Sequence, residues 1–200
     1  DFSNLEVDGN WKISDAPLGS IGEYLFQIPK DWADTYVDGK YLANGRCRPG
    51  QGGGSYGPSL FAISPYEQGD PPINATVLDA VKLLYYPSDK PWDVTKSWGD
   101  YWYGGSWLTK GSKHAVVFPG RKAIRDDLNG LEYYGKPLLD HQGAQGGKGY
   151  YSNPYHYAML FYDPSDLADV ALGIKENYEV KPYAIFNPSK YTIRPDYDSE

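Results

Sequence analysis

Glycine and proline recur along the whole chain and interrupt its apolar runs after a few residues. The 200 residues include 23 Gly and 16 Pro. Because glycine favours turns and proline lacks a backbone N–H, this spacing leaves little room for long helices and favours short strands joined by tight turns. A chain of this length can form one domain with a substantial core. We therefore expect a single all-β domain over 1–200, with an N-terminal extension over 1–20 and a C-terminal tail over 192–200.

The short apolar or alternating runs between these breaks predict seven antiparallel strands. A polar turn of four residues, 110–113, joins two of these runs and predicts a hairpin. The predicted strands cover 41–43, 59–63, 81–86, 106–109, 114–118, 157–162 and 183–186.

Two short helices interrupt the predicted strands. The first covers 30–36 and follows Pro29, and the second covers 165–172 between a capping Asp163 and a closing Gly173. Each helix follows an apolar strand that ends in proline, and a similar ending occurs a third time. This pattern indicates a faint internal repeat, for which chance similarity of short Leu-Phe runs is the alternative. The three endings are 25–29, 60–65 and 160–164.

Four short motifs follow one another along the chain. They are Gly-Arg-Cys-Arg at 45–48, Gly-Pro-Ser-Leu-Phe-Ala at 57–62, Gly-Gly-Ser-Trp-Leu-Thr at 104–109 and Phe-Tyr-Asp-Pro-Ser-Asp-Leu-Ala at 161–168. Taken in this order, they resemble secreted, β-propeller-like bacterial proteins without an assigned activity. The likeness covers residues 20 to 190 and implies a propeller-like fold of short antiparallel strands, of which this chain is about the C-terminal half. Half a propeller has unpaired strand edges, so we expect a second chain or segment to complete the fold.

Charge and composition exclude some classes of partner. The net charge is −7 and no run of Lys or Arg occurs, so the sequence offers no footprint for nucleic acid. The apolar runs are far shorter than the roughly 20 residues that span a membrane. A single Cys excludes an intrachain disulfide. Abundant Gly, Pro and Tyr and one glycosylation sequon at 74–76 nevertheless favour an extracellular or otherwise secreted location.

The densest aromatic segment is 92–107, with four Trp, two Tyr and two Asp in sixteen residues. Aromatic faces beside short polar acceptors suit a pyranose ring, whose C–H face stacks while its hydroxyls need hydrogen bonds. The sequence therefore predicts a glycan-binding surface here, with burial between sheets as the alternative for each Trp. The candidate ligand-binding residues of the segment are Trp98, Asp100, Trp102, Tyr103 and Trp107.

Arginines provide a second candidate surface. In an extended segment Arg46 and Arg48 point to one face and Cys47 to the other, towards the core. The two guanidiniums, joined by Arg121, could bind a carboxylate or sulfate bidentately. Solvated or ion-paired arginines are the alternative.

Catalysis is the alternative to binding alone. A glycoside hydrolase or polysaccharide lyase would draw its acid and base from groups such as Asp100, Tyr103 or His156, although no carboxylate pair stands out. The three His have no zinc-ligand spacing, so we expect no cofactor. Calcium is the one metal with candidate ligands, at 163–169 or in the tail at 196–200. A structural or assembly protein, whose aromatic residues join chains, is the third function considered.

Overall fold

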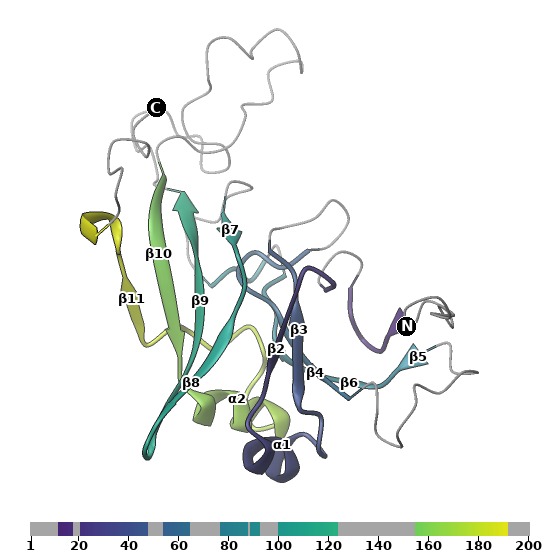
Figure 1. Cartoon of the computed structure of the whole chain (residues 1–200). Helices are drawn as coiled ribbons and strands as arrows, with labels where there is room; N and C mark the ends of the chain where they lie inside the picture. Colours follow the sequence, from purple (N-terminus) through teal and green to yellow (C-terminus); the bar gives the residue numbers. More distant parts are fainter. Residues whose placement is uncertain are drawn as a thin grey trace, which may run out of the picture.

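The computed structural model describes residues 12–17, 21–47, 54–64, 77–87, 89–92, 100–123 and 155–191. This part of the chain is mainly β, with two antiparallel sheets and two short helices (Figure 1). A separate pair of two-residue strands, β1 (Lys12–Ile13) and β5 (Val77–Leu78), is parallel. A 3₁₀ helix, η2 (Ser189–Tyr191), follows the last strand.

The first sheet is a four-stranded antiparallel meander. Its strand order is β2-β3-β4-β6, so β3 and β4 lie inside the sheet. Every side chain of β4 is buried, because both faces of this strand are covered. The strands are β2 (Tyr24–Gln27), β3 (Leu42–Gly45), β4 (Leu60–Ile63) and β6 (Ala80–Leu84).

The second sheet is built on one long strand of 11 residues, β9. On one side β9 pairs with β10, which pairs with β11; on the other side β8 and β7 share a single edge of β9. The approach of β7 depends on Gly120, because a Cβ there would lie 2.2 Å from the Tyr101 carbonyl oxygen. The strands are β7 (Tyr101–Trp102), β8 (Ser106–Lys110), β9 (Lys113–Ala123), β10 (Tyr155–Tyr162) and β11 (Ala184–Phe186).

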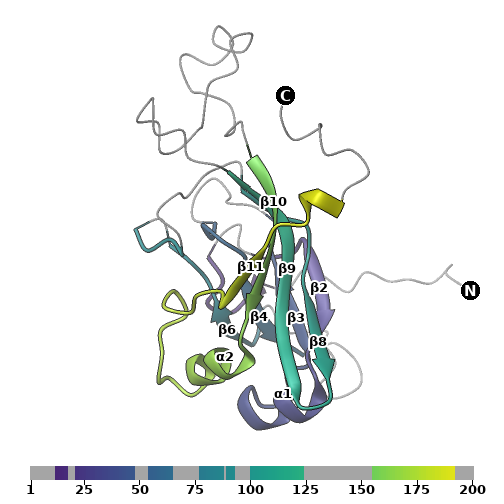
Figure 2. The same ribbon diagram turned by 90° about the vertical axis from the view of Figure 1, so that its left-hand side faces the viewer.

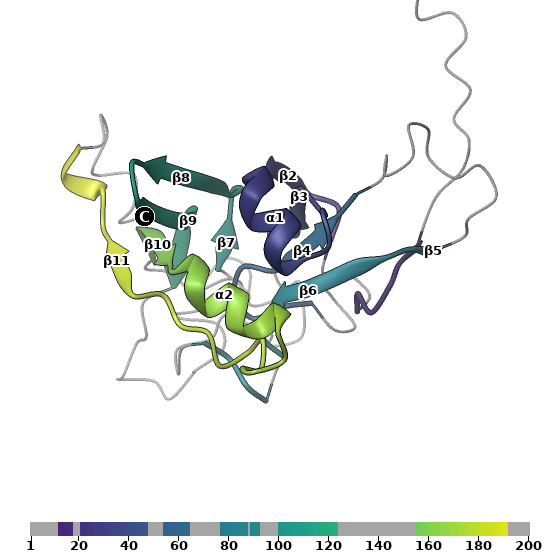
Figure 3. The same ribbon diagram turned by 90° about the horizontal axis from the view of Figure 1, so that it is seen from below.

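Each sheet contains one unit in which a strand ends at a proline, a short helix follows, and the next strand returns antiparallel beside the first. In the first unit α1 (Lys30–Tyr36) connects β2 to β3, and in the second unit α2 (Pro164–Ala171) connects β10 to β11. The two helices lie at the same end of the molecule (Figure 3). Asp163 caps α2 by accepting a hydrogen bond from the backbone N–H of Ser165 at 2.9 Å, whereas α1 has no side-chain cap.

The core lies between the two sheets, which stack in Figure 2 with the second sheet in front of β2, β3 and β4. Phe118 of β9 is its centre. Its ring lies 5.9 Å from Tyr24, 6.1 Å from Phe26 and 5.7 Å from Tyr162, measured between centroids. Gly105 leaves room for these rings, since a Cβ there would lie 2.4 Å from the Phe26 ring. The two sheets therefore share one aromatic core.

Buried tyrosine hydroxyls connect the sheets by hydrogen bonds. Tyr86, after β6, donates to the carbonyl oxygen of Val180 at 2.7 Å, and its hydroxyl lies 3.2 Å from that of Tyr162. Within the first sheet, the Tyr24 hydroxyl donates to the carbonyl oxygen of Ser59. Burial raises the pKa of all three phenols above their ordinary value, so they stay neutral and act as donors.

The predicted elements agree with the structure to within a few residues, except that β9 and β10 extend further. The helix predicted over 30–36 has those bounds, and the one predicted over 165–172 covers 164–171. The predicted turn joins β8 to β9, with Gly111 at φ +60°. The mainly β class, the antiparallel sheets and the two short helices are therefore confirmed.

The described strands form two open sheets, so a closed propeller stays a prediction. The C-terminal tail and most of the N-terminal extension lie outside the described residues. Neither helix of the described chain has the length and hydrophobicity needed to cross a membrane.

Candidate functional site

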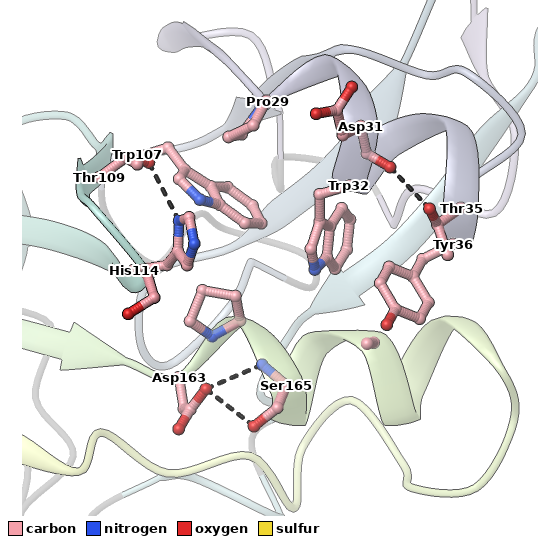
Figure 4. Close-up of a pocket in the computed structure, with 13 residues that line it drawn as sticks. Pro29, Asp31, Trp32, Thr35, Tyr36, Trp107, Thr109, His114, Asp163 and Ser165 are labelled. Carbon is pink, nitrogen blue, oxygen red and sulfur yellow. Dashed lines mark hydrogen bonds between the residues drawn. The ribbon is translucent and has the colours of Figure 1, made fainter.

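A groove of about 690 Å³ opens where α1, the β8–β9 turn and the start of α2 meet (Figure 4). Three elements far apart in the sequence contribute to it because both proline-helix junctions lie at this end of the sheets. Pro29 begins α1 on one side and Pro164 begins α2 on the other. The groove is therefore formed by the two strand-helix-strand units together with the β8–β9 hairpin, which lies between them in the sequence.

Three aromatic rings form one continuous wall of the groove. Trp32 and Tyr36 are one helical turn apart on α1, and their ring centroids are 5.1 Å apart. Trp107 of β8 lies 4.9 Å from Trp32 at an interplanar angle of 59°. All three side chains are half-buried, so each keeps part of its surface open. The wall combines large apolar area with access to solvent.

Short polar side chains surround this aromatic wall. The Thr109 hydroxyl is hydrogen-bonded to Nδ1 of His114 at 3.1 Å, and both residues come from the β8–β9 hairpin. Asp163 is fixed by its cap on α2 and also accepts a hydrogen bond from the Ser165 hydroxyl at 2.8 Å. These groups are held in place before any ligand arrives.

The charge of the groove is negative. Among the residues that line it, Asp31 and Asp163 are the carboxylates, and none is Lys or Arg. The indole Nε1 of Trp107 is buried without a hydrogen-bond partner in the described structure. An unpaired buried donor is costly and uncommon in folded proteins. The groove therefore offers acceptors, hydroxyls and aromatic faces, but no fixed positive charge.

The structure divides the predicted aromatic segment. Trp107 lines the groove, whereas Trp102 is fully buried and packs edge-on against Trp92, with centroids 6.3 Å apart. Asp100 is only 1% exposed and forms a buried ion pair with Nζ of Lys122 at 2.9 Å. Trp102 and Asp100 do not line the groove, and their contacts lie in the interior of the protein.

Tyr103 and Arg121 come together elsewhere. Tyr103 is exposed and lies 5.0 Å from Tyr101, and the Arg121 guanidinium lies 5.8 Å from the Tyr101 ring. Arg121 pairs across the sheet with Tyr101 on one side and Tyr157 on the other. Tyr101, Tyr103 and Arg121 lie towards the end of β9 that is opposite to the hairpin and the groove.

The predicted pairing of Arg46 with Arg48 stays a prediction, because only Arg46 belongs to the described chain. Nε of Arg46 lies 3.5 Å from a carboxylate oxygen of Glu23, so Arg46 is ion-paired. Cys47 is buried, which confirms its predicted place in the core. Arg48, Trp98 and the side chain of His156 lie outside the described residues.

The described residues hold no group of three or more His, Cys, Asp or Glu side chains suited to a metal ion. The three aspartates considered for calcium have other contacts. Asp163 caps α2, Asp166 is ion-paired with Lys175, and Asp169 lies 4.0 Å from the same ammonium group. The second calcium candidate, the acidic tail, is not part of the described chain.

Trp32 and Tyr36 are the aromatic groove residues that sequence reasoning missed. Their signal is the spacing of four residues in a predicted helix, which places both rings on one face. Comparisons with protein-family models, curated proteins and solved structures found no match to this chain. The resemblance to secreted propeller-like proteins therefore stays a prediction, and the function has to be argued from the groove itself.

Proposed function

We propose that this protein binds a carbohydrate chain in the groove between α1, the β8–β9 turn and α2. The observation that carries the proposal is the half-buried wall of Trp32, Tyr36 and Trp107, bordered by hydroxyl and carboxylate groups. Sugar rings stack on aromatic faces and need hydrogen-bond partners at their edges, and this wall offers both. Its volume of about 690 Å³ is in the range of small-molecule sites, which is roughly 300–1,000 Å³.

The charge of the lining residues favours an uncharged glycan. Asp31 and Asp163 would repel the carboxylates of uronic acids and the sulfates of sulfated sugars, and no lining Lys or Arg compensates. The same carboxylates can accept hydrogen bonds from sugar hydroxyls. We therefore expect neutral hexose or N-acetylhexosamine oligomers to bind more tightly than oligogalacturonate.

The test is calorimetric titration with neutral cello-, manno- and chito-oligosaccharides, and with oligogalacturonate. Trp32→Ala should weaken binding of the best neutral ligand about tenfold, because a lost stacking ring costs on the order of 1 kcal/mol. Tyr103→Ala is the matched control, since it removes an exposed aromatic ring at the other end of β9 and should leave the affinity unchanged.

A second variant is needed because Trp32 also packs on Trp107. A loss of binding in Trp32→Ala alone would not distinguish the loss of a stacking ring from a folding defect. His114 is exposed and its ring is hydrogen-bonded to Thr109, so His114→Ala should keep the melting temperature while it weakens binding. Absence of binding to every oligosaccharide would refute the proposal, as would a loss caused by Tyr103→Ala and not by Trp32→Ala. Release of reducing ends in the same mixtures would instead favour the hydrolase alternative.

We further propose an extracellular or otherwise secreted location and a propeller-like arrangement, in which the β2-β3-β4-β6 meander is one blade. The antiparallel order of the meander supports this assignment, since propeller blades are four-stranded sheets. Light scattering on the 200-residue chain tests whether a second chain or segment is needed to complete the fold. A stable monomer of 22.4 kDa with a cooperative unfolding transition would count against a missing half.

A further inference from the structure

The final strand of the second sheet, β11, is exposed along its whole length. In the described chain it pairs with β10 alone, through Ala184, Ile185 and Phe186. All three side chains are exposed, with Ile185 at 54% and Phe186 at 39%. Edge strands with apolar side chains are sites for pairing with another strand, and proteins normally protect them. The edge at β11 is therefore a candidate interaction surface.

Exposed apolar side chains gather on this strand and directly beside it. Of the ten exposed large hydrophobic side chains among the described residues, four fall between positions 183 and 191. The ring of Phe186 stacks on that of Tyr191, with centroids 6.0 Å apart. Clustered apolar exposure of this kind marks interaction surfaces, whereas single exposed side chains do not. The four are Tyr183, Ile185, Phe186 and Tyr191.

The first unit indicates what is missing at this edge. There β3 occupies the place after α1 that β11 occupies after α2, and β4 pairs with the outer edge of β3 in antiparallel register. That pairing leaves Ala43 of β3 fully buried. In the described part of the second unit no strand lies in the place of β4. The missing element is therefore an antiparallel strand with apolar side chains.

The charges next to β11 indicate which charge the residues on either side of the missing strand should carry. Between positions 180 and 191 the chain carries Lys181 and Lys190 and no acidic residue, although its net charge is −7. Both lysines are exposed. Antiparallel pairing of β11 with its own copy about Ile185 would bring Lys181 of one chain near Lys190 of the other. Repulsion disfavours this dimer, whereas acidic flanks would be attracted.

We propose that β11 binds an extended segment of a different polypeptide, apolar at its centre and acidic at both ends, which adds to the second sheet as an antiparallel strand. Main-chain hydrogen bonds would supply part of the affinity. Contacts to Ile185 and Phe186 would supply selectivity for an apolar centre. This proposal does not depend on the glycan groove, which includes no β11 residue.

The probe is a fluorescent peptide, Asp-Ser-Leu-Phe-Ala-Ile-Ser-Asp, whose centre copies β4, titrated with the whole chain by anisotropy. Replacing Ile185 with Gln and Phe186 with Gln, singly, should weaken binding about tenfold, since each loses buried apolar area without a change of charge. Leu108→Gln is the matched control, because Leu108 is an exposed apolar residue of β8, on the opposite edge of the sheet. A peptide with Lys ends should bind more weakly than the acidic one.

Three results would overturn the proposal. One is no anisotropy change up to about 1 mM peptide, the weak limit of a specific contact. Another is an equal loss with Leu108→Gln and Ile185→Gln. The third is a dimer in light scattering that Ile185→Gln dissociates, because the occupant would then be a second copy. All three positions are exposed, so circular dichroism should show that each variant is folded.

Discussion

The two strand-helix-strand units begin alike and end differently. In both, an apolar strand runs into a proline, a helix of seven or eight residues follows, and the next strand returns antiparallel. Yet β3, with the sequence Leu-Ala-Asn-Gly, lies inside its sheet, whereas β11, with the more apolar sequence Ala-Ile-Phe, is exposed. Burial of these strands thus follows from what lies beside them and not from their own hydrophobicity.

The helices of the two units also differ, in how their first turns are held. α2 has a capping Asp163 and a proline in its first turn, so its start is fixed by local hydrogen bonds. α1 has no side-chain cap. Both helices pack on the core, α1 through Ala33 and α2 through Leu167 and Ala168. The two units therefore share tertiary packing, and the second adds a local cap that the first lacks.

The largest expected effect tests the contrast between enclosed and exposed strands. Leu60→Ala, in the fully buried strand that covers β3, should lower the free energy of unfolding by about 2–5 kcal/mol. Ile185→Ala, in exposed β11, should change it by less than about 0.5 kcal/mol. Urea denaturation measures both, and similar losses would show that β11 is enclosed after all.

The next largest effect concerns the hydrogen bond between Tyr86 and Val180. Tyr86 follows β6 of the first sheet, and Val180 lies in the segment between α2 and β11. Tyr86→Phe removes the donor to the Val180 carbonyl oxygen and should cost about 1–3 kcal/mol. Tyr162→Phe is the control, because it removes a hydroxyl from the same cluster but leaves that carbonyl paired. An equal cost for the two variants would assign the effect to packing.

The same tyrosines predict a loss of stability in alkali. Burial raises the pKa of Tyr86 and Tyr162 in the folded protein, so the unfolded chain releases these protons first. Stability is therefore complete below the ordinary tyrosine pKa of about 10 and falls as pH rises above it. In urea denaturation from pH 8 to 11, Tyr86→Phe should show a smaller decrease than the unaltered chain.

The smallest expected effect tests the side-chain cap that α2 has and α1 lacks. Asp163→Ala should cost about 1 kcal/mol, because the backbone N–H of Ser165 loses its acceptor. Asp163→Asn keeps an acceptor at that place and should cost much less. If Asn is as harmful as Ala in thermal denaturation, charge rather than capping stabilises the start of α2.

Much of the fold could be predicted because its signals are local. Proline, a capping aspartate and a closing glycine define α2, and apolar runs between turns define the strands. The sharing of one β9 edge by β7 and β8 could not be predicted. It depends on contacts such as that of Gly120 with Tyr101, which no local pattern records.

The lining of the groove could be predicted only in part. Trp107 belongs to the predicted aromatic surface and lines the groove, but Trp102 and Asp100 of the same segment face the core. A short strand gives no periodicity from which to tell its buried face. Trp32 reaches Trp107 only because both helices pack at one end of the sheets, and this arrangement is set by tertiary structure.

The sharing of β9 by two short strands also affects how the sheet opens. β8 pairs with one half of β9 and β7 with the other, while β10 covers the opposite edge over eight residues. The central amides of β9 cannot exchange with solvent deuterium unless β10 or one of these short strands detaches. Because β8 and β7 pair with separate parts of β9, we expect them to detach separately, so that the groove end and the tyrosine end of this strand open independently.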